Sequence, residues 1–119
     1  GKLLAMESEI IADTGAYGSY GIAVATRSAV HATGPYNVPN VSVISQAVYT
    51  NNSWCGAMRG FGVPQIAIAH ESQMDKLAQR LGLDPIAFRL KNAFEKGSVT
   101  PTGQRLEASV GIRETLKKI

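Results

Sequence analysis

The residues best suited to chemistry lie in the stretch WCGAMRGFGVPQ, residues 54–65, where an arginine and a phenylalanine stand among three glycines. Glycine tolerates positive φ and allows close approach of a ligand, so this spacing predicts an irregular loop around Arg59 and Phe61. The guanidinium offers a planar fork of donors and the ring can stack on flat molecules. The pair therefore suits an anionic, planar ligand, with Arg27 as a partner from the preceding element. In the plainer interpretation, Arg59 pairs with a carboxylate and Phe61 fills the core.

Other motifs that could carry chemistry have structural interpretations. The stretch GAYGSYG, residues 15–21, has a glycine at every third position but lacks the sequence context of a phosphate-binding loop, so it predicts a turn. His31 and His70 have no ligand-type residue at metal-binding spacing, and we predict no metal bound by these side chains. Cys55 is the single cysteine, which excludes an internal disulfide, and it is interpreted as a small buried residue rather than a nucleophile.

Composition limits the class of protein. The 119 residues are 45% hydrophobic and 18% charged, which is enough for one globular core. The net charge of +3 is scattered and forms no basic stripe, so nucleic-acid binding is not expected. No apolar run approaches the roughly 18 residues of a membrane helix, and no secretion signal is recognisable. We therefore expect a cytoplasmic protein that does not enter a membrane.

The first half of the chain predicts strands around one helix. In LLAMESEIIAD, residues 3–13, apolar and acidic residues alternate as in a strand. The inward face is predicted to carry Leu4, Met6, Ile10 and Ala12. A helix is expected over residues 22–33, with Ser19 as its cap and Ile22 on its buried stripe, although a strand over residues 22–26 stays open. Residues 41–50, VSVISQAVYT, then alternate as a second strand.

The second half predicts helices with clear ends. Pro64 suits the first turn of a helix that continues to Leu81 and stops at Gly82. Asp84 and Pro85 suit the cap and first turn of the next helix. A last amphipathic helix is expected near residues 110–119. The whole pattern predicts an α+β fold, with two or more strands followed by two to three helices.

At this point the sequence resembles a known family. AMRGFGVPQ resembles the RGFGxPQ loop of the molybdenum hydroxylases, the xanthine dehydrogenase and aldehyde oxidase family. The blocks DTGAYG, YNVPNV, AHESQMDKLAQRLGLDPIAFRLKNA and TPTGQRLE resemble successive stretches of its molybdopterin-binding subunit. The resemblance covers nearly the whole chain and implies that residues 1–119 form one fragment of the molybdopterin-binding domain.

The resemblance also implies a cofactor and residue roles. In this family a molybdenum cofactor hydroxylates an electron-poor carbon with oxygen from water, and iron–sulfur clusters and FAD on other domains or subunits remove the electrons. Arg59 resembles the residue whose main-chain amide lies beside the molybdenum centre, and Gly60 would keep that approach open. Phe61 resembles the phenylalanine that stacks on the substrate. Arg27 resembles the arginine with which purine-hydroxylating members stabilise developing negative charge.

Several family motifs have no counterpart among these residues, and this shapes the expected function. They are the upstream glycine-rich cofactor loop, the substrate-binding glutamate, and the downstream glutamate that acts as general base. We therefore expect the segment alone to be inactive and to depend on the remainder of the molybdenum subunit. The resemblance is nearest to bacterial enzymes that oxidise hypoxanthine or xanthine. A hydroxylase for nicotinate, an aldehyde or an aromatic thioester, and a non-catalytic binding module, remain the alternatives.

Overall fold

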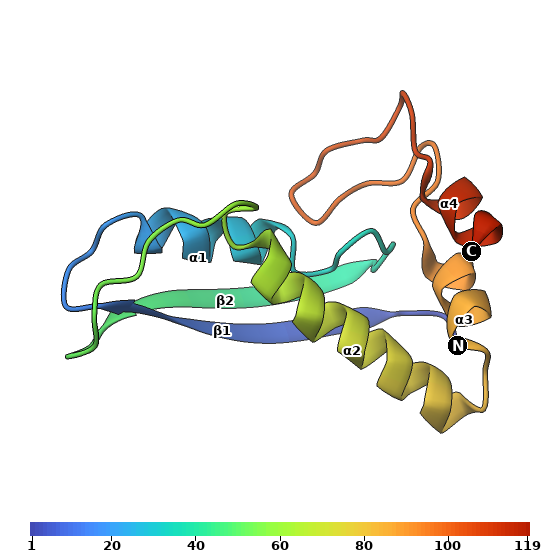
Figure 1. The fold of residues 1–119 in the computed structure, drawn as a ribbon. Coiled ribbons are helices and arrows are strands. Elements are labelled where there is room, and N and C mark those ends of the chain that lie inside the picture. Colours follow the sequence, from blue (N-terminus) through green and yellow to red (C-terminus); the bar gives the residue numbers. More distant parts are fainter. The chain divides into compact units, whose positions relative to one another are not determined.

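The computed structural model describes residues 1–119 and contains two strands and four helices, so the predicted α+β class is confirmed (Figure 1). The elements are β1 (Ala5–Gly15), α1 (Gly21–Val30), β2 (Asn40–Tyr49), α2 (Val63–Leu81), α3 (Pro85–Asn92) and α4 (Ile112–Lys118). Contacts divide the chain into two units, each described by itself below. Unit 1 comprises residues 1–6, 33–41 and 70–119, and unit 2 comprises residues 7–32 and 42–69.

The two strands pair in parallel and are joined through α1. At one end the Asn40 side chain donates to the carbonyl of Leu4, and at the other the Thr50 amide donates to the carbonyl of Gly15. Parallel strands require a crossover connection, which the segment containing α1 supplies. Residues 22–26 belong to this helix, so the alternative of a strand over these residues is excluded.

Alternation along the strands follows the prediction with one exception. In β1, Met6, Ile10 and Ala12 are half-buried, whereas the acidic residues between them are exposed. Leu4 was expected on the same inward face but is 69% exposed. It precedes the first residue of β1, so the regular two-residue alternation of a paired strand does not extend to it.

Helix α1 packs through small residues rather than through the apolar stripe expected from the sequence. Its buried positions are Gly21, Ala25 and Ser28, while Ile22 is 67% exposed. Close packing explains why a small residue occupies position 21, because a side chain there would overlap Thr14 of β1. The prediction for the cap was also wrong: the N-cap residue is Tyr20, and no side chain caps the helix.

The junction between α2 and α3 forms as the sequence predicts. Gly82 has φ +63°, and the amide of Leu83 donates to the carbonyl of Ala78, which closes the end of α2 as glycine-terminated helices do. Asp84 then caps α3 by accepting from the amide of Ala87 at 2.8 Å, with Pro85 in the first turn. The helical periodicity of residues 64–81 predicts Leu81 on the inward face, but this last residue of α2 is 52% exposed.

The core of unit 1 is small and aromatic. Tyr36, Met74, Ala78 and Phe88 form the buried cluster. Phe88, only 2% exposed, occupies the central position on α3, whereas the sequence pattern pointed to Ile86, Leu90 and Phe94. Those three are half-buried or buried beside it.

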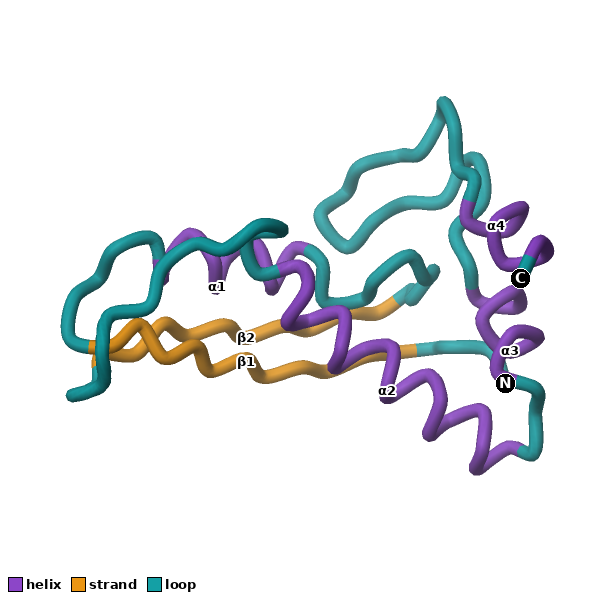
Figure 2. Tube along the Cα trace, in the orientation of Figure 1, coloured by secondary structure: helices purple, strands orange, loops and turns teal.

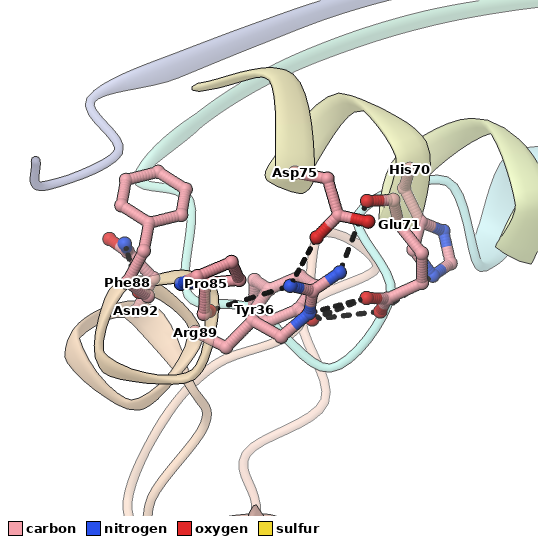
Figure 3. A network of polar contacts seen from close by, with 8 residues as sticks. All are labelled: Tyr36, His70, Glu71, Asp75, Pro85, Phe88, Arg89 and Asn92. Carbon is pink, nitrogen blue, oxygen red and sulfur yellow. Dashed lines mark hydrogen bonds and ion pairs between the residues drawn. The ribbon is translucent and has the colours of Figure 1, made fainter. Parts of the chain in front are cut away.

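A polar network joins α2, α3 and residue 36 within unit 1 (Figure 3). The Nε of Arg89 donates to Glu71 at 2.8 Å and its Nη1 donates to Asp75 at 2.7 Å. Tyr36 donates its hydroxyl proton to the same Glu71 carboxylate at 2.8 Å. Burial, and then the hydrogen bond to Glu71, raise the pKa of Tyr36, so the hydroxyl keeps its proton. Desolvation lowers the pKa of Arg89, but hydrogen bonds to Asp75 and Glu71 outweigh it and raise that pKa overall.

Unit 2 exposes an unusual number of large apolar side chains. They include Ile11, Tyr17, Tyr20, Ile22, Ile44, Tyr49, Trp54, Met58 and Ile68. Single exposed apolar residues are normal, but a set of this size is typical of surfaces that contact other parts of a protein or a ligand. None of the helices combines the length and apolar character needed to cross a membrane.

The network predicts that Arg89 stabilises unit 1 far more than an ordinary surface arginine does. Its side chain is 12% exposed and satisfies two carboxylates. In the complete protein, we expect Arg89→Met to lower the local opening free energy of α3 by about 2 kcal/mol, because it removes charge-assisted hydrogen bonds. Hydrogen exchange of α3 measures this quantity. Arg113→Met is the matched control, because Arg113 makes only a 3.9 Å pair with the exposed Glu95 and should change the opening energy by less than about 1 kcal/mol. Equal effects of the two variants would contradict the prediction.

Candidate functional site

The predicted loop around Arg59 and Phe61 lies between β2 and α2, over residues 50–62, and is called the Arg59 loop below (Figure 2). Its last residues adopt a run of positive φ angles: +93° at Gly60, +53° at Phe61 and +95° at Gly62. Glycine adopts this conformation readily and phenylalanine rarely does. The positive φ angles on both sides of Phe61 therefore explain why glycine occupies positions 60 and 62, as the sequence suggested.

Gly62 anchors the loop directly on α1. The hydroxyl of Ser28, a buried residue of α1, donates to the carbonyl of Gly62 at 3.1 Å. A Cβ atom at Gly62 would lie 2.5 Å from both the Ser28 Oγ and the carbonyl oxygen of Val24. The loop and the helix thus meet backbone to backbone, with no room for a side chain between them. Because Arg27 precedes Ser28, the helix that carries the predicted arginine does return to the loop.

Gly60 faces a different neighbour. A Cβ atom at this position would lie 2.5 Å from the Cγ of Pro64, in the first turn of α2. The carbonyl of Gly60 accepts from Val63, and the carbonyl of Met58 accepts from Phe61, so two tight turns follow one another. The need for glycine at position 60 is therefore already set within the chain, by φ and by Pro64. The role that the resemblance implies for Gly60, an open approach to the cofactor, would come in addition to these two requirements.

Phe61 presents part of its ring beside another aromatic side chain. Its residue is half-buried, and its ring meets that of Tyr20 edge to face, with ring centroids 6.2 Å apart. Tyr20 is itself 65% exposed and stands immediately before α1. Edge-to-face pairs of this kind restrict ring orientation and contribute about 0.5–1.5 kcal/mol. The pair forms an aromatic corner that combines the Arg59 loop with the start of α1.

The two candidate arginines are not used inside the chain. Arg27 and Arg59 are exposed, and neither side chain forms an ion pair or hydrogen bond with another residue of the chain. The plainer interpretation, in which Arg59 pairs with a carboxylate, is therefore not what the structure shows. The guanidinium groups of both residues remain able to bind an external anion.

The main chain of the loop has spare donors as well. The amides of residues 56–60 donate no hydrogen bond to any group of the chain, and these residues are exposed. Consecutive main-chain N–H groups that are not used by the fold can bind anionic groups. The arrangement consequently combines free amides, two cations and an aromatic face in one unit of the protein.

Comparison with known proteins assigns the chain to a family. The sequence pattern of the molybdopterin cofactor-binding domain matches residues 1–93. The chain belongs to this family. It is 57% identical over 118 residues to the nicotinate dehydrogenase large molybdopterin subunit of Eubacterium barkeri, covering 99% of the chain and 28% of that subunit. It is 38% identical over 119 residues to the xanthine dehydrogenase molybdenum-binding subunit of Escherichia coli O157:H7, covering 99% of the chain and 16% of that subunit.

The fold agrees with this membership. The aldehyde oxidoreductase of Desulfovibrio gigas superimposes with a TM-score of 0.92 at 38% identity, over 98% of this chain and 13% of that one. The chain thus spans less than a third of the length of these relatives. The resemblance to the molybdenum hydroxylases inferred from the RGFGVPQ loop is confirmed.

The residues of this domain fit an anionic cofactor. A molybdopterin-type cofactor is anionic and would accept hydrogen bonds from main-chain amides. Within this chain the unused amides at residues 56–60, together with Arg59, supply such donors. The side chains offer no group of three His, Cys, Asp or Glu residues able to hold a metal ion directly.

Sequence reasoning missed two residues that shape the site. Ser28 holds Gly62, and Tyr20 orients Phe61, yet neither was singled out beforehand. A signal for Ser28 did exist, since Gly21, Ala25 and Ser28 are small residues at helical spacing, which favours close packing of a backbone. For Tyr20 there was none, because a contact across about forty residues leaves no local pattern.

The remaining candidates from the sequence are His31, His70 and Cys55, and each lies close to another group of the chain. The Nδ1 of His31 lies 3.0 Å from the carbonyl of Arg27 one turn earlier. His70 lies beside Tyr36 and 3.5 Å from Glu71 in unit 1. Cys55 is exposed, with its sulfur 3.6 Å from the carbonyl of Ser53, so the prediction of a buried cysteine was wrong.

The loop geometry predicts that Gly60 is required for cofactor loading. In the complete protein, we expect Gly60→Val to reduce bound molybdenum at least about tenfold, because valine is strained at φ +93° and collides with Pro64, which displaces the loop. Molybdenum per subunit is measured by elemental analysis.

Gly97→Val provides the control for this experiment. Gly97 has nearly the same φ, +92°, but a Cβ there meets nothing within 4 Å. The two variants share the backbone strain and differ in the collision. Normal molybdenum content and activity in Gly60→Val would contradict the prediction.

Proposed function

We propose that the complete protein is a molybdenum hydroxylase that oxidises an electron-poor N-heterocycle, with hypoxanthine or xanthine as the foremost substrates. The supporting observation is Arg27, an exposed cation without a partner in the chain. It lies on α1, which holds the Arg59 loop through the hydrogen bond between Ser28 and Gly62. When bound, the molybdenum cofactor supplies oxygen transfer from water, and iron–sulfur and FAD domains or subunits accept the electrons. The residues of this chain bind and orient the substrate.

Phe61 is proposed to hold the plane of the ring. A purine is flat, and an aromatic face stabilises it over a large contact area at small entropic cost. The unusual backbone of Phe61 and the edge of Tyr20 both restrict the ring, so its orientation is set before a substrate arrives. Such preorganisation lowers the free energy needed to align the reacting carbon.

Arg27 is proposed to stabilise negative charge that develops on the purine during attack. The guanidinium is permanently charged, and a cation aimed at developing charge lowers the barrier more than it strengthens substrate binding. The chain contributes no competing carboxylate to Arg27. Its charge is therefore available to the substrate.

The general base is proposed to come from the remainder of the molybdenum subunit. Three carboxylates of this chain, Glu7, Glu9 and Glu71, could be considered for this role, but Glu71 is committed to Tyr36 and Arg89 in unit 1. Glu7 and Glu9 project from the exposed face of β1 and make no contact with the Arg59 loop through any hydrogen bond. We therefore expect the 119-residue segment alone to show no turnover.

The one cysteine, free and exposed, is compatible with the cytoplasmic location expected from the sequence.

Nicotinate is a second candidate substrate, favoured by the 57% identity to a nicotinate dehydrogenase subunit. Nicotinate is also a flat, electron-poor ring, and it carries a carboxylate in the ground state. In this case Arg27 would bind the carboxylate throughout the reaction rather than charge formed in the transition state. The two substrates thus assign different energetic roles to the same residue.

Steady-state kinetics of the complete protein test both proposals with Arg27→Met. For a purine, we expect kcat to fall about a hundredfold to a thousandfold with little change in KM, because only transition-state stabilisation is lost. For nicotinate, KM should rise instead, because uniform binding is lost. Simple aldehydes should be spared in either case.

Arg80→Met is the matched control, since Arg80 is an exposed arginine without an ion pair in the last turn of α2. It should leave all rates unchanged. Absence of activity on every N-heterocycle, with activity on aldehydes, would reject the proposed substrate class. Equal losses on purine and aldehyde would reject the role of Arg27.

A further inference from the structure

Asp13, near the end of β1, gathers an unusual set of hydrogen bonds for an exposed carboxylate. Its Oδ1 accepts from the hydroxyl of Thr50 and from the amide of Gly15, both at 2.7 Å. Its Oδ2 accepts from the side-chain amide of Asn52 at 2.6 Å. The Thr50 hydroxyl in turn accepts from the main-chain amide of Asn52 at 3.2 Å. Both oxygens of Asp13 are thus used, and two of its three donors belong to the first residues of the Arg59 loop.

The main chain around Asp13 reinforces this attachment. The amide of Ala16 donates to the carbonyl of Asn52, and the amide of Cys55 donates to the carbonyl of Thr14, both at 3.1 Å. Gly15 has φ +72°, and a side chain there would overlap the carbonyl of Ser53. The end of β1 and the beginning of the loop therefore lie against each other as closely as backbones allow.

The Arg59 loop is consequently held at two places and open between them. Asp13 and its neighbours hold residues 50–55, and Ser28 holds Gly62. The amides of residues 56–60 lie between these attachments and bond to nothing in the chain. The positions of these free amides thus depend on where the two ends are held.

We propose that Asp13 is a positioning residue for the cofactor-binding face of the Arg59 loop. It acts through Thr50 and Asn52, which connect it to the loop, and does not touch cofactor or substrate itself. This inference rests on the proposed function as a molybdenum hydroxylase and on the fit of the unused loop amides to an anionic cofactor.

The charge of Asp13 suits this role. Hydrogen bonds from Thr50, then Asn52 and the Gly15 amide, lower the pKa of Asp13 below its ordinary value, so the carboxylate is ionised at neutral pH. Hydrogen bonds to an ionised acceptor are shorter and stronger than those between neutral groups.

The test uses three variants of the complete protein. Asp13→Ala removes both acceptor oxygens, and Asp13→Asn retains the shape and one acceptor. Glu9→Ala is the matched control, since Glu9 projects from the same face of β1 and makes no side-chain hydrogen bond or ion pair. Hydrogen exchange of residues 13–17 and 50–55 reports the attachment, exchange of α3 reports the general fold, and molybdenum per subunit reports cofactor loading.

We expect Asp13→Ala to accelerate exchange in residues 13–17 and 50–55 at least about tenfold, and to lower molybdenum content several-fold, with α3 unaffected. Asp13→Asn should give intermediate values for both readouts, and Glu9→Ala should match the unaltered protein. Unchanged exchange in residues 50–55, full molybdenum content in Asp13→Ala, or equal loss of protection in α3 would each overturn the proposal. None of these readouts depends on substrate. A protein without activity on N-heterocycles that still shows the expected losses would reject the proposed function and support the role of Asp13.

Discussion

The candidate site depends on the contact between Gly62 and α1. A hydroxyl from a buried serine meets a main-chain carbonyl at 3.1 Å, and the space that a Cβ would need is already filled by Ser28 and Val24. Backbones in such contact are placed with less freedom than side chains that can change rotamer. This contact fixes the helix bearing Arg27 to the loop, immediately after Phe61, which has a positive φ between two glycines.

The polar groups of the domain divide into those that the fold uses and those that it leaves to a ligand. Arg89 satisfies two carboxylates, and Tyr36 shares one of them, so this network is committed to holding unit 1 together. Arg27, Arg59 and the amides of residues 56–60 contribute nothing comparable to the fold. Because groups of the second kind are exposed and have no partner in the chain, a ligand can bind them without breaking a bond of the fold.

The two candidate substrates differ in when they carry negative charge. A purine becomes negative as it reacts, whereas nicotinate is negative from the start, and a single exposed arginine can serve either. The relatives carry both names, nicotinate dehydrogenase and xanthine dehydrogenase, so membership of the family leaves the substrate open. Kinetics separate the two cases because a cation that acts only in the transition state changes kcat, and one that acts throughout changes KM.

The sequence by itself determined the local elements and the identity of the loop. Alternation predicted β1 and β2, and the caps at Asp84 and Gly82 predicted the junction of α2 and α3, because these signals depend on neighbours only a few residues away. Tertiary structure alone decided that Ile22 faces outward, that Phe88 is the buried centre of α3, and that Ser28, Tyr20 and Asp13 support the loop. The physical reason is that burial and hydrogen bonding at these positions are set by segments brought together from about ten to fifty residues away, and such pairings leave no periodic trace in the chain.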